Sequence, residues 1–341
     1  MSNFRPETRK GEAPLVKIEN LKVYYFLKAG PVIRAVDNVS LDIYRGEVLG
    51  LAGESGCGKS TLAYAIMKIV PKPGQIVDGR IIIDGIDIVK VSDRYMSKHV
   101  RWRLVSMVFQ GAMNALNPVF RVEDQIAEAI MLHEKNITKE EAIERARDLL
   151  EMVGIERSRG RSYPHELSGG MRQRAMIAMA LACNPKMVIA DEPTTALDVV
   201  IQSQVMKLLR ELRDKYKLTV LLITHDLSVI AEICDRVAIM YAGKIVELAD
   251  IKTIFKNPYH PYTAGLMSAF PSIVGPKRRI KGIPGFPPDL RNPPPGCRFH
   301  PRCPYAQEIC KSKEPEFREI KDGHFVACHF AEELGGKVIE W

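Results

Sequence analysis

The N-terminal part of the chain alternates apolar and polar side chains. The first half of residues 16–25 (VKIENLKVYY) follows the period of two that is typical of a half-exposed strand. Residues 39–43 and 81–83 are assigned to strands in the same way. We therefore predict an antiparallel sheet in this part of the chain.

Three short runs have a different pattern. Residues 48–52, 187–190 and 220–223 are almost continuously apolar, as are strands that are buried on both faces of a parallel sheet. Each run is followed by a turn with polar residues and then by a helical pattern. This order predicts an α/β nucleotide-binding core whose chemistry lies at the carboxyl ends of the strands.

Between the first and second runs the pattern is helical. Thr138 and Glu141 match a capping box, apolar side chains follow at helical spacing, and Gly154 marks the end. We predict a helical subdomain over about residues 95–165, inserted into the core. Nine of the 22 prolines fall between positions 271 and 301, which predicts a linker without regular structure.

Composition limits the class of protein. The 341 residues, 46% of them apolar and 26% charged, fit one large domain and a smaller one. No apolar run approaches the roughly 18 residues that span a bilayer, and the N-terminus lacks the apolar core of a signal peptide. We therefore expect a cytosolic protein. The net charge of +8 suits an anionic membrane surface or nucleic acid, and equally a well-solvated surface.

Residues 53–60 (GESGCGKS) match the phosphate-binding motif G-x-x-x-x-G-K-[ST] in full. The motif directly follows an apolar run and opens a helical pattern, which is the context it requires. Its glycines allow backbone N–H groups to converge on phosphate oxygens at a helix N-terminus. Lys59 is predicted to reach the β- and γ-phosphates of a nucleotide, and the Ser60 hydroxyl to bind Mg²⁺.

An acidic pair ends the second apolar run. Asp191 is predicted to bind Mg²⁺, usually through water, and Glu192 to polarise the attacking water. The alternative for this pair is a solvated strand end, which the phosphate-binding motif in the same chain disfavours. Together the two motifs predict an enzyme that hydrolyses ATP.

A third element makes the chain resemble the ATP-binding cassette (ABC) family. Residues 167–174 (LSGGMRQR) are similar to the signature sequence of that family, with Met171 where glutamine is most often found. Ser168 and the two glycines after it open a helical pattern, which forms a second phosphate-binding helix terminus. The resemblance implies a P-loop ABC nucleotide-binding domain with a RecA-like α/β core, an antiparallel β subdomain and an inserted helical subdomain.

Other residues match further elements of that family. Gln110 resembles the glutamine that contacts Mg²⁺ and water and senses the membrane partner. Residues 196–198 (ALD), which include Asp198, resemble the loop that crosses the dimer interface. His225 resembles the switch histidine that contacts the γ-phosphate. Tyr25 is the candidate for the ring that stacks on adenine; a neighbouring aromatic, or a core position for Tyr25, stays open.

The resemblance implies that ATP is held between the phosphate loop of one cassette and the signature of another, so that hydrolysis requires a dimer. The implied catalytic residues are Glu192, His225 and Gln110, and the implied Mg²⁺ ligands are Ser60, Gln110 and Asp191. The residues expected to bind nucleotide and Mg²⁺ are Tyr25, Gly53, Ser55, Gly56, Cys57, Gly58, Lys59, Ser60, Thr61, Gln110, Ser168, Gly169, Gly170, Asp191 and Asp198.

Four of the seven cysteines lie near the C-terminus, with five, six and 17 residues between them: Cys297, Cys303, Cys310 and Cys328. Structural zinc sites usually contain close C-x₂₋₄-C pairs, which are missing here. Spacing alone therefore leaves an iron–sulfur cluster, zinc and unpaired thiols open.

Two segments beside these cysteines resemble the C-terminal extension of the oligopeptide/dipeptide (nickel) import ATPases: residues 257–263 (NPYHPYT) and 296–304 (GCRFHPRCP). In that subfamily the four cysteines hold a [4Fe–4S] cluster, so the resemblance implies a structural iron–sulfur cluster here. His300, His324 and His329 lie close in sequence and keep Zn²⁺ as the alternative.

The expected protein is the ATP-hydrolysing, D-type subunit of a peptide importer. We assign residues 1–255 to the ABC nucleotide-binding domain and 256–341 to a proline-rich linker with the four-cysteine module. The implied partners are a second ABC ATPase subunit in a heterodimer, two membrane permeases and an extracellular solute-binding protein. The implied location is the cytoplasmic face of the cell membrane, as a peripheral subunit. The transported substrate stays open between dipeptides, oligopeptides, nickel complexes and sugars.

The alternative function is that of a soluble ABC ATPase that acts on nucleic acid or ribosomes. The segment between the phosphate loop and the signature is too short for the long coiled coil of DNA-repair members, and ribosome-acting members usually carry two cassettes. We therefore expect no nucleic-acid partner.

Overall fold

The structure is a computed structural model that describes residues 11–28, 30–111, 115–195, 197–268 and 282–335. The chain divides into two compact units. The first unit consists of Met1–Asp42, Leu49–Ile81 and Thr224–Trp341, and the second of Ile43–Val48 and Ile82–Ile223. Each unit is therefore assembled from segments that lie far apart in the sequence.

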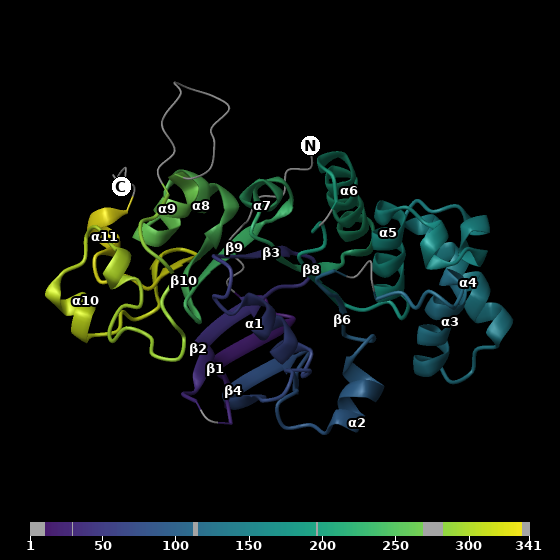
Figure 1. The fold of residues 1–341 in the computed structure, drawn as a ribbon, viewed down its shortest axis with the longest axis horizontal. Helices are drawn as coiled ribbons and strands as arrows, with labels where there is room; N and C mark the ends of the chain where they lie inside the picture. Colours follow the sequence, from purple (N-terminus) through teal and green to yellow (C-terminus); the bar gives the residue numbers. More distant parts are fainter. Residues whose placement is uncertain (1–10, 29, 112–114, 196, 269–281, 336–341) are drawn as a thin grey trace. The chain divides into compact units, whose positions relative to one another are not determined.

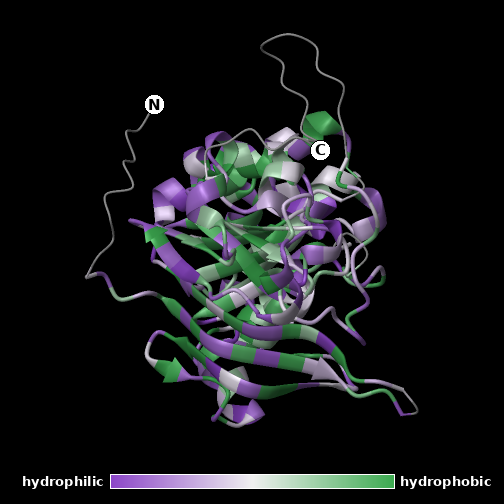
Figure 2. Cartoon of the chain, turned by 90° about the vertical axis from the view of Figure 1, so that its left-hand side faces the viewer, coloured by the Kyte–Doolittle hydropathy of each residue, from purple (hydrophilic) through white to green (hydrophobic). Residues whose placement is uncertain are grey.

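The first unit contains most of the predicted N-terminal sheet. Strands β1 (Val16–Tyr25), β2 (Ile33–Ile43) and β4 (Gly74–Ile83) lie in the order β2-β1-β4. Buried and more exposed positions alternate along much of β1 and β2, and Figure 2 shows this as hydrophobic and hydrophilic bands along the strands of the lower sheet. The strands predicted for this region are confirmed, and two of them are longer than the pattern indicated.

A second sheet of the first unit has the strand order β11-β12-β10-β9-β3. Its strands β10, β9 and β3 are labelled in Figure 1. Strand β3 (Val48–Ala52) is parallel to β9 (Arg236–Tyr241), which pairs antiparallel with β10 (Lys244–Asp250). The C-terminal strands β12 (His324–Val326) and β11 (Arg318–Lys321) extend this sheet beyond β10 through antiparallel pairing. The cysteine-rich part of the chain therefore shares a sheet with the strand that precedes the phosphate loop.

The first unit also contains helices. They are α1 (Lys59–Ile66), α7 (Leu227–Ile233), α8 (Ile251–Lys256), α9 (Pro261–Ser268), the short η5 (His300–Arg302), α10 (Glu308–Ser312) and α11 (Ala331–Leu334). Residues 282–299 contain no helix or strand, as the prolines predicted; the rest of the predicted linker, up to residue 281, lies outside the described residues.

The second unit has a parallel sheet of the order β8-β7-β6. Its strands β6 (Val105–Val108), β7 (Met187–Asp191) and β8 (Thr219–Ile223) are buried at every position. The prediction that continuously apolar runs form buried parallel strands is confirmed for β7 and β8, and for β3 in the first unit. Strand β5 (Ile86–Asp87) pairs antiparallel with the end of β4.

The stretch predicted to be helical, about residues 95–165, also contains strand β6, and its longer helices begin only at Val122. The longer helices of this unit are α3 (Val122–His133), α4 (Lys139–Met152), α5 (Gly169–Ala180) and α6 (Val199–Tyr216). The short ones are α2 (Asp93–Tyr95), the π-helix η1 (Met96–Val100), η3 (Arg157–Arg161) and η4 (Pro164–Glu166).

The start and end of α4 are those that the sequence predicted. The Thr138 hydroxyl accepts a hydrogen bond from the N–H of Glu141 at 3.2 Å, and the Glu141 carboxylate accepts one from the N–H of Thr138 at 2.8 Å. Gly154, with φ of 76°, follows the helix. Over the part of the chain that the structure describes, no helix combines the length and the apolar character that a membrane crossing requires.

Candidate nucleotide-binding and hydrolysis site

The phosphate-binding motif forms a tight loop between β3 and α1. Gly53 (φ 153°) and Gly58 (φ 111°) adopt backbone conformations that side chains disfavour. A Cβ atom on Gly53 would lie 2.1 Å from the carbonyl oxygen of Met240, and one on Gly58 would lie 2.1 Å from that of Ala35. Both glycines are therefore required, because the loop lies directly on backbone of the first unit.

Lys59 is the first residue of α1 and its side chain folds back over the loop. Its ammonium group donates hydrogen bonds to the carbonyl oxygens of Gly53 at 2.7 Å and of Glu54 at 3.0 Å. Lys59 is only 6% exposed, so its charge is held within the loop that is predicted to bind phosphates.

The other predicted residues of the loop surround this lysine. Ser55 and Gly56 are exposed at its tip, and Ser60 and Thr61 are partly buried in the first turn of α1. Cys57 is buried, and burial raises the pKa of its thiol. The thiol therefore stays uncharged beside the phosphate-binding backbone.

Tyr25 and His225 complete the group of predicted residues in the first unit. The Tyr25 hydroxyl lies 3.4 Å from the Thr61 hydroxyl, at the start of α1. The Tyr24 hydroxyl instead donates a hydrogen bond to Asp37 at 2.7 Å, so the two neighbouring hydroxyls bond to different segments. His225 is exposed and directly precedes Asp226, the N-cap of α7.

In the second unit, the carboxyl end of β7 carries the acidic pair. Asp191 ends the strand and is fully buried. Glu192 has a left-handed backbone (φ 46°), and its N–H donates to the carbonyl oxygen of Ile223 at 2.8 Å. Asp191 is therefore buried, whereas Glu192, one residue later, is partly exposed.

The Glu192 carboxylate is oriented by two hydrogen bonds. It accepts one from the Gln110 side-chain amide at 2.7 Å and one from the Thr195 hydroxyl at 3.0 Å. Gln110 and Glu192 were predicted separately from the sequence, and in the structure they are hydrogen-bonded to each other. Thr195 was not predicted; a hydroxyl three residues after the glutamate is the signal that could have identified it.

The signature and the predicted interface loop each contain a residue that caps the N-terminus of a helix. Ser168 caps α5 by accepting from the N–H of Met171 at 3.3 Å, and Asp198 caps α6 by accepting from the N–H of Ile201 at 3.0 Å. A Cβ atom on Gly170 would lie 2.6 Å from Ile201, so these two helix starts are packed together. Ala196 lies outside the described residues.

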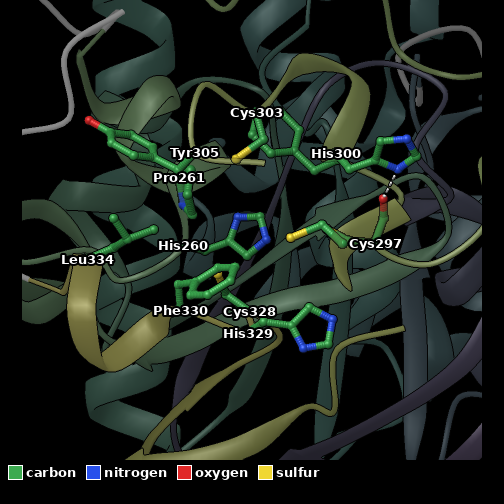
Figure 3. Close-up of a pocket in the computed structure, with 12 residues that line it drawn as sticks. His260, Pro261, Cys297, His300, Cys303, Tyr305, Cys328, His329, Phe330 and Leu334 are labelled. Atoms are coloured by element: carbon green, nitrogen blue, oxygen red, sulfur yellow. Dashed lines mark hydrogen bonds between the residues drawn. The ribbon is translucent and has the colours of Figure 1, made fainter. Parts of the chain in front are cut away.

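The four C-terminal cysteines line one pocket of the first unit, together with the side chains of His260, His300 and His329 (Figure 3). The lining cysteines are Cys297, Cys303, Cys310 and Cys328. Burial raises the pKa of Cys297 to about 11, and that of Cys303 and Cys328 to about 12. These thiols stay protonated unless a metal displaces the proton.

The histidines near the pocket have other partners. The Nδ1 atom of His300 lies 2.9 Å from the carbonyl oxygen of Cys297, and Nε2 of His329 lies 2.9 Å from that of Lys313. His324 does not line the pocket; its Nε2 atom lies 2.7 Å from the Glu247 carboxylate. The donor set of the pocket is therefore dominated by thiols.

Among the described residues, no group of three or more Cys, His, Asp or Glu side chains is arranged around a single metal ion. The four thiols line one pocket, and thiols are ligands that both zinc and iron–sulfur clusters use. The iron–sulfur assignment stays a prediction.

Comparison with known proteins places the chain in a family. The model of the ABC transporter family matches residues 36–195, and the model of the oligopeptide/dipeptide transporter C-terminal region matches residues 246–310. The oligopeptide transport ATP-binding protein AppD of Bacillus subtilis (strain 168) is 47% identical over 326 residues, which cover 95% of this chain and 98% of that protein. The chain belongs to the ATP-binding subunits of oligopeptide/dipeptide ABC transporters.

Other relatives agree with this assignment. The dipeptide transport ATP-binding protein DppD of Escherichia coli (strain K12) is 43% identical over 325 residues, covering 95% of this chain and 98% of that protein. Among solved structures, the ATP-binding cassette MJ0796 bound to ADP and Pi, a dimer in a post-hydrolysis state, matches with a TM-score of 0.62 and 31% identity, over 69% of this chain and 98% of that one.

The ABC nucleotide-binding fold and the ATPase class that the sequence predicted are thereby confirmed. The chain is an ABC ATPase whose phosphate loop, acidic pair and signature lie in the elements that the motifs indicated.

Proposed function

We propose that this chain hydrolyses ATP to power the import of dipeptides or oligopeptides through a membrane ABC transporter. The observation that carries the proposal is the length of the match. Similarity to peptide transport ATP-binding proteins continues through the phosphate loop, the signature and the C-terminal region, over 95% of the chain. A soluble ABC ATPase acting on nucleic acid or ribosomes is not favoured, because these relatives are named as transport proteins.

The proposed complex contains a second ABC ATPase subunit, two membrane permeases and an extracellular solute-binding protein. This chain carries one phosphate loop and one signature, and we propose that the opposing pair comes from a sister subunit in a heterodimer. The assembly would hold this chain at the cytoplasmic face of the cell membrane. We also propose the division into an ATPase domain over residues 1–255 and a C-terminal module over 256–341.

The roles of the site residues follow from their chemistry. Lys59 would bind the β- and γ-phosphates, and Ser60 with Asp191 and Gln110 would hold Mg²⁺, which neutralises phosphate charge when bound. Glu192, held by Gln110 at 2.7 Å, would orient the attacking water and accept its proton.

The remaining residues would sense the γ-phosphate and the partner subunit. Ser168 and its following glycines would bind the nucleotide of the partner, His225 would contact the γ-phosphate, and Asp198 would lie at the subunit interface. Tyr25 would stack on adenine. Loss of phosphate removes the charge that both helix N-termini bind, so the dimer opens after hydrolysis.

We further propose that the four cysteines hold a [4Fe–4S] cluster with a structural role. The support is the convergence of four thiols on one pocket, with Cys310 buried and the other three partly buried, in a segment where prolines leave little apolar core. An anaerobic preparation should be brown and contain iron and sulfide. A colourless preparation with one zinc ion per chain would refute the cluster in favour of the zinc alternative.

The transport proposal is tested with the assembled complex in lipid vesicles. Peptide delivered by the binding protein should stimulate ATP hydrolysis and accumulate on the side opposite to the one from which it is supplied, and Glu192→Gln should abolish both. An ATPase that responds to nucleic acid or ribosomes and not to peptide would overturn the proposal.

A further inference from the structure

Two arginines lie between the first two cysteines of the pocket. Residues 297–303 (CRFHPRC), here called the arginine segment, carry Arg298 and Arg302, which are only 7% and 8% exposed. Buried arginines require several acceptors, because the guanidinium group has five N–H donors and stays charged. One of these acceptors, the Glu54 carboxylate, belongs to the phosphate loop itself.

Arg302 forms a bidentate ion pair with Glu54 of the phosphate loop. Its two terminal nitrogens donate to the two carboxylate oxygens of Glu54 at 2.7 and 2.9 Å. Its Nε atom donates to the carbonyl oxygen of Pro284 at 2.9 Å, and a further bond of 3.3 Å reaches the Tyr241 hydroxyl. The guanidinium is thus fixed in one orientation, and paired fork to fork with the carboxylate.

Glu54 transmits this contact to the rest of the loop. Its backbone N–H donates to the Tyr262 hydroxyl at 2.9 Å, and its carbonyl oxygen accepts from the Lys59 ammonium at 3.0 Å. One residue therefore joins Arg302, α9 and the lysine predicted to bind phosphate. Displacement of Glu54 would displace one of the two carbonyl oxygens that position the Lys59 ammonium.

Arg298 supports the opposite end of the loop. It pairs with the Asp37 carboxylate and donates to the carbonyl oxygen of Ala242. The next residue, Gly243, donates its N–H to the carbonyl oxygen of Cys57 at 2.8 Å. The arginine segment thus contacts the start of the phosphate loop directly and its later part through one backbone turn.

We propose that Arg302 is a positioning residue for ATP binding, which acts through Glu54, and that the C-terminal module thereby controls the geometry of the phosphate loop. When the ion pair is lost, Glu54 and the Lys59 ammonium lose their fixed positions. ATP then has to order the loop as it binds, which lowers affinity.

The test measures ATP binding to the full chain with variants on both sides of the contact. Arg302→Gln and Glu54→Gln should each raise the Kd of a fluorescent ATP analogue by about tenfold, the factor that corresponds to about 1.4 kcal/mol. The double variant should bind no more weakly than either single variant, because both remove the same interaction. Arg302→Lys, which keeps one charged bond, should recover part of the affinity.

The matched control is Arg318→Gln in the same module. Arg318 forms an exposed ion pair with Glu332 at 3.0 Å and is in β11, so its loss should leave the Kd unchanged. In the assembled transporter, Arg302→Gln should raise the KM for ATP and leave kcat near the wild-type value, because Glu192 and Gln110 are untouched. If Arg302 only stabilised the C-terminal module, its substitution would lower the melting temperature and would not raise KM selectively over kcat.

Three results would overturn the proposal. The first is a wild-type Kd for folded Arg302→Gln, and the second is a double variant whose effect equals the product of the single effects. The third is equal weakening by Arg318→Gln, which would indicate general damage to the module. If Arg302→Gln fails to fold, Glu54→Gln decides alone, and a wild-type Kd refutes the proposal. Since only ATP is measured, the outcome does not depend on which solute is transported.

Discussion

Ser168→Ala separates two roles of one side chain. In the structure the Ser168 hydroxyl caps α5 by accepting from the N–H of Met171 at 3.3 Å. In the proposed dimer the same helix start also binds the γ-phosphate held by the partner subunit. Alanine removes the oxygen and leaves the backbone and the glycines that follow unchanged.

The two roles predict effects of different size. Loss of an N-cap costs about 1 kcal/mol of stability, and here water can reach the freed N–H because the position is exposed. Loss of a hydrogen bond to a charged phosphate costs about 1.5–3 kcal/mol, which is roughly a ten- to hundredfold decrease in kcat/KM for ATP. The loss of activity should therefore exceed what the change in stability explains.

Thr138→Ala is the matched control for this comparison. Thr138 caps α4 through the same kind of bond, at 3.2 Å, and is not part of any predicted nucleotide site. Urea unfolding should show a similar destabilisation of about 1 kcal/mol for both variants. ATPase assays of the assembled complex should show wild-type turnover for Thr138→Ala and the large decrease only for Ser168→Ala.

Equal rates of ATP hydrolysis by Ser168→Ala and Thr138→Ala, at equal folded fraction, would refute the second role of Ser168. In that case α5 would be an ordinary capped helix, and the signature would have no contact with a neighbouring subunit's nucleotide.

Three further predictions concern the ATP site and the C-terminal pocket. Lys59→Ala should eliminate ATP turnover, because it removes the charge held within the phosphate loop at 2.7 Å from the Gly53 carbonyl oxygen; measurable steady-state hydrolysis would contradict this role. Glu192→Gln should bind ATP and keep the subunits closed, seen as a stable dimer in size-exclusion chromatography with ATP; wild-type turnover would disprove its assigned role. Burial lowers the pKa of His260 to about 4, whereas an unfolded histidine titrates near 6.5, so the unfolded chain binds the extra proton between these values. The free energy of unfolding should have its full value above pH 6.5 and fall by about 3 kcal/mol as the pH decreases towards 4. In urea titrations at several pH values, His260→Gln should lack this decrease; the same pH dependence in the variant and the wild type would argue against the burial effect.

Features that depend on neighbouring residues were predictable from the sequence. The phosphate loop, the cap of α4 and the cap of α5 each involve residues within a few positions, so their geometry is encoded in a short segment. Buried parallel strands were also identified correctly, because a strand covered on both faces must be apolar at every position.

Contacts between distant segments needed the structure. Gln110 and Glu192 were each predicted, and their hydrogen bond across 82 positions was not. Nothing in the periodicity of residues 318–326 indicated that these short strands extend the sheet at β10. Strands of three or four residues carry too little pattern to reveal their partner, which is selected by the packing around them.

The sequence by itself determined that this protein binds and hydrolyses a nucleotide, since that chemistry requires particular residues at fixed short spacing. Only the tertiary structure decided that four cysteines converge on one pocket and that Arg302 pairs with Glu54, 248 positions away. The physical reason is that a salt bridge or a thiol pocket imposes geometry on side chains in space and leaves their separation along the chain unconstrained.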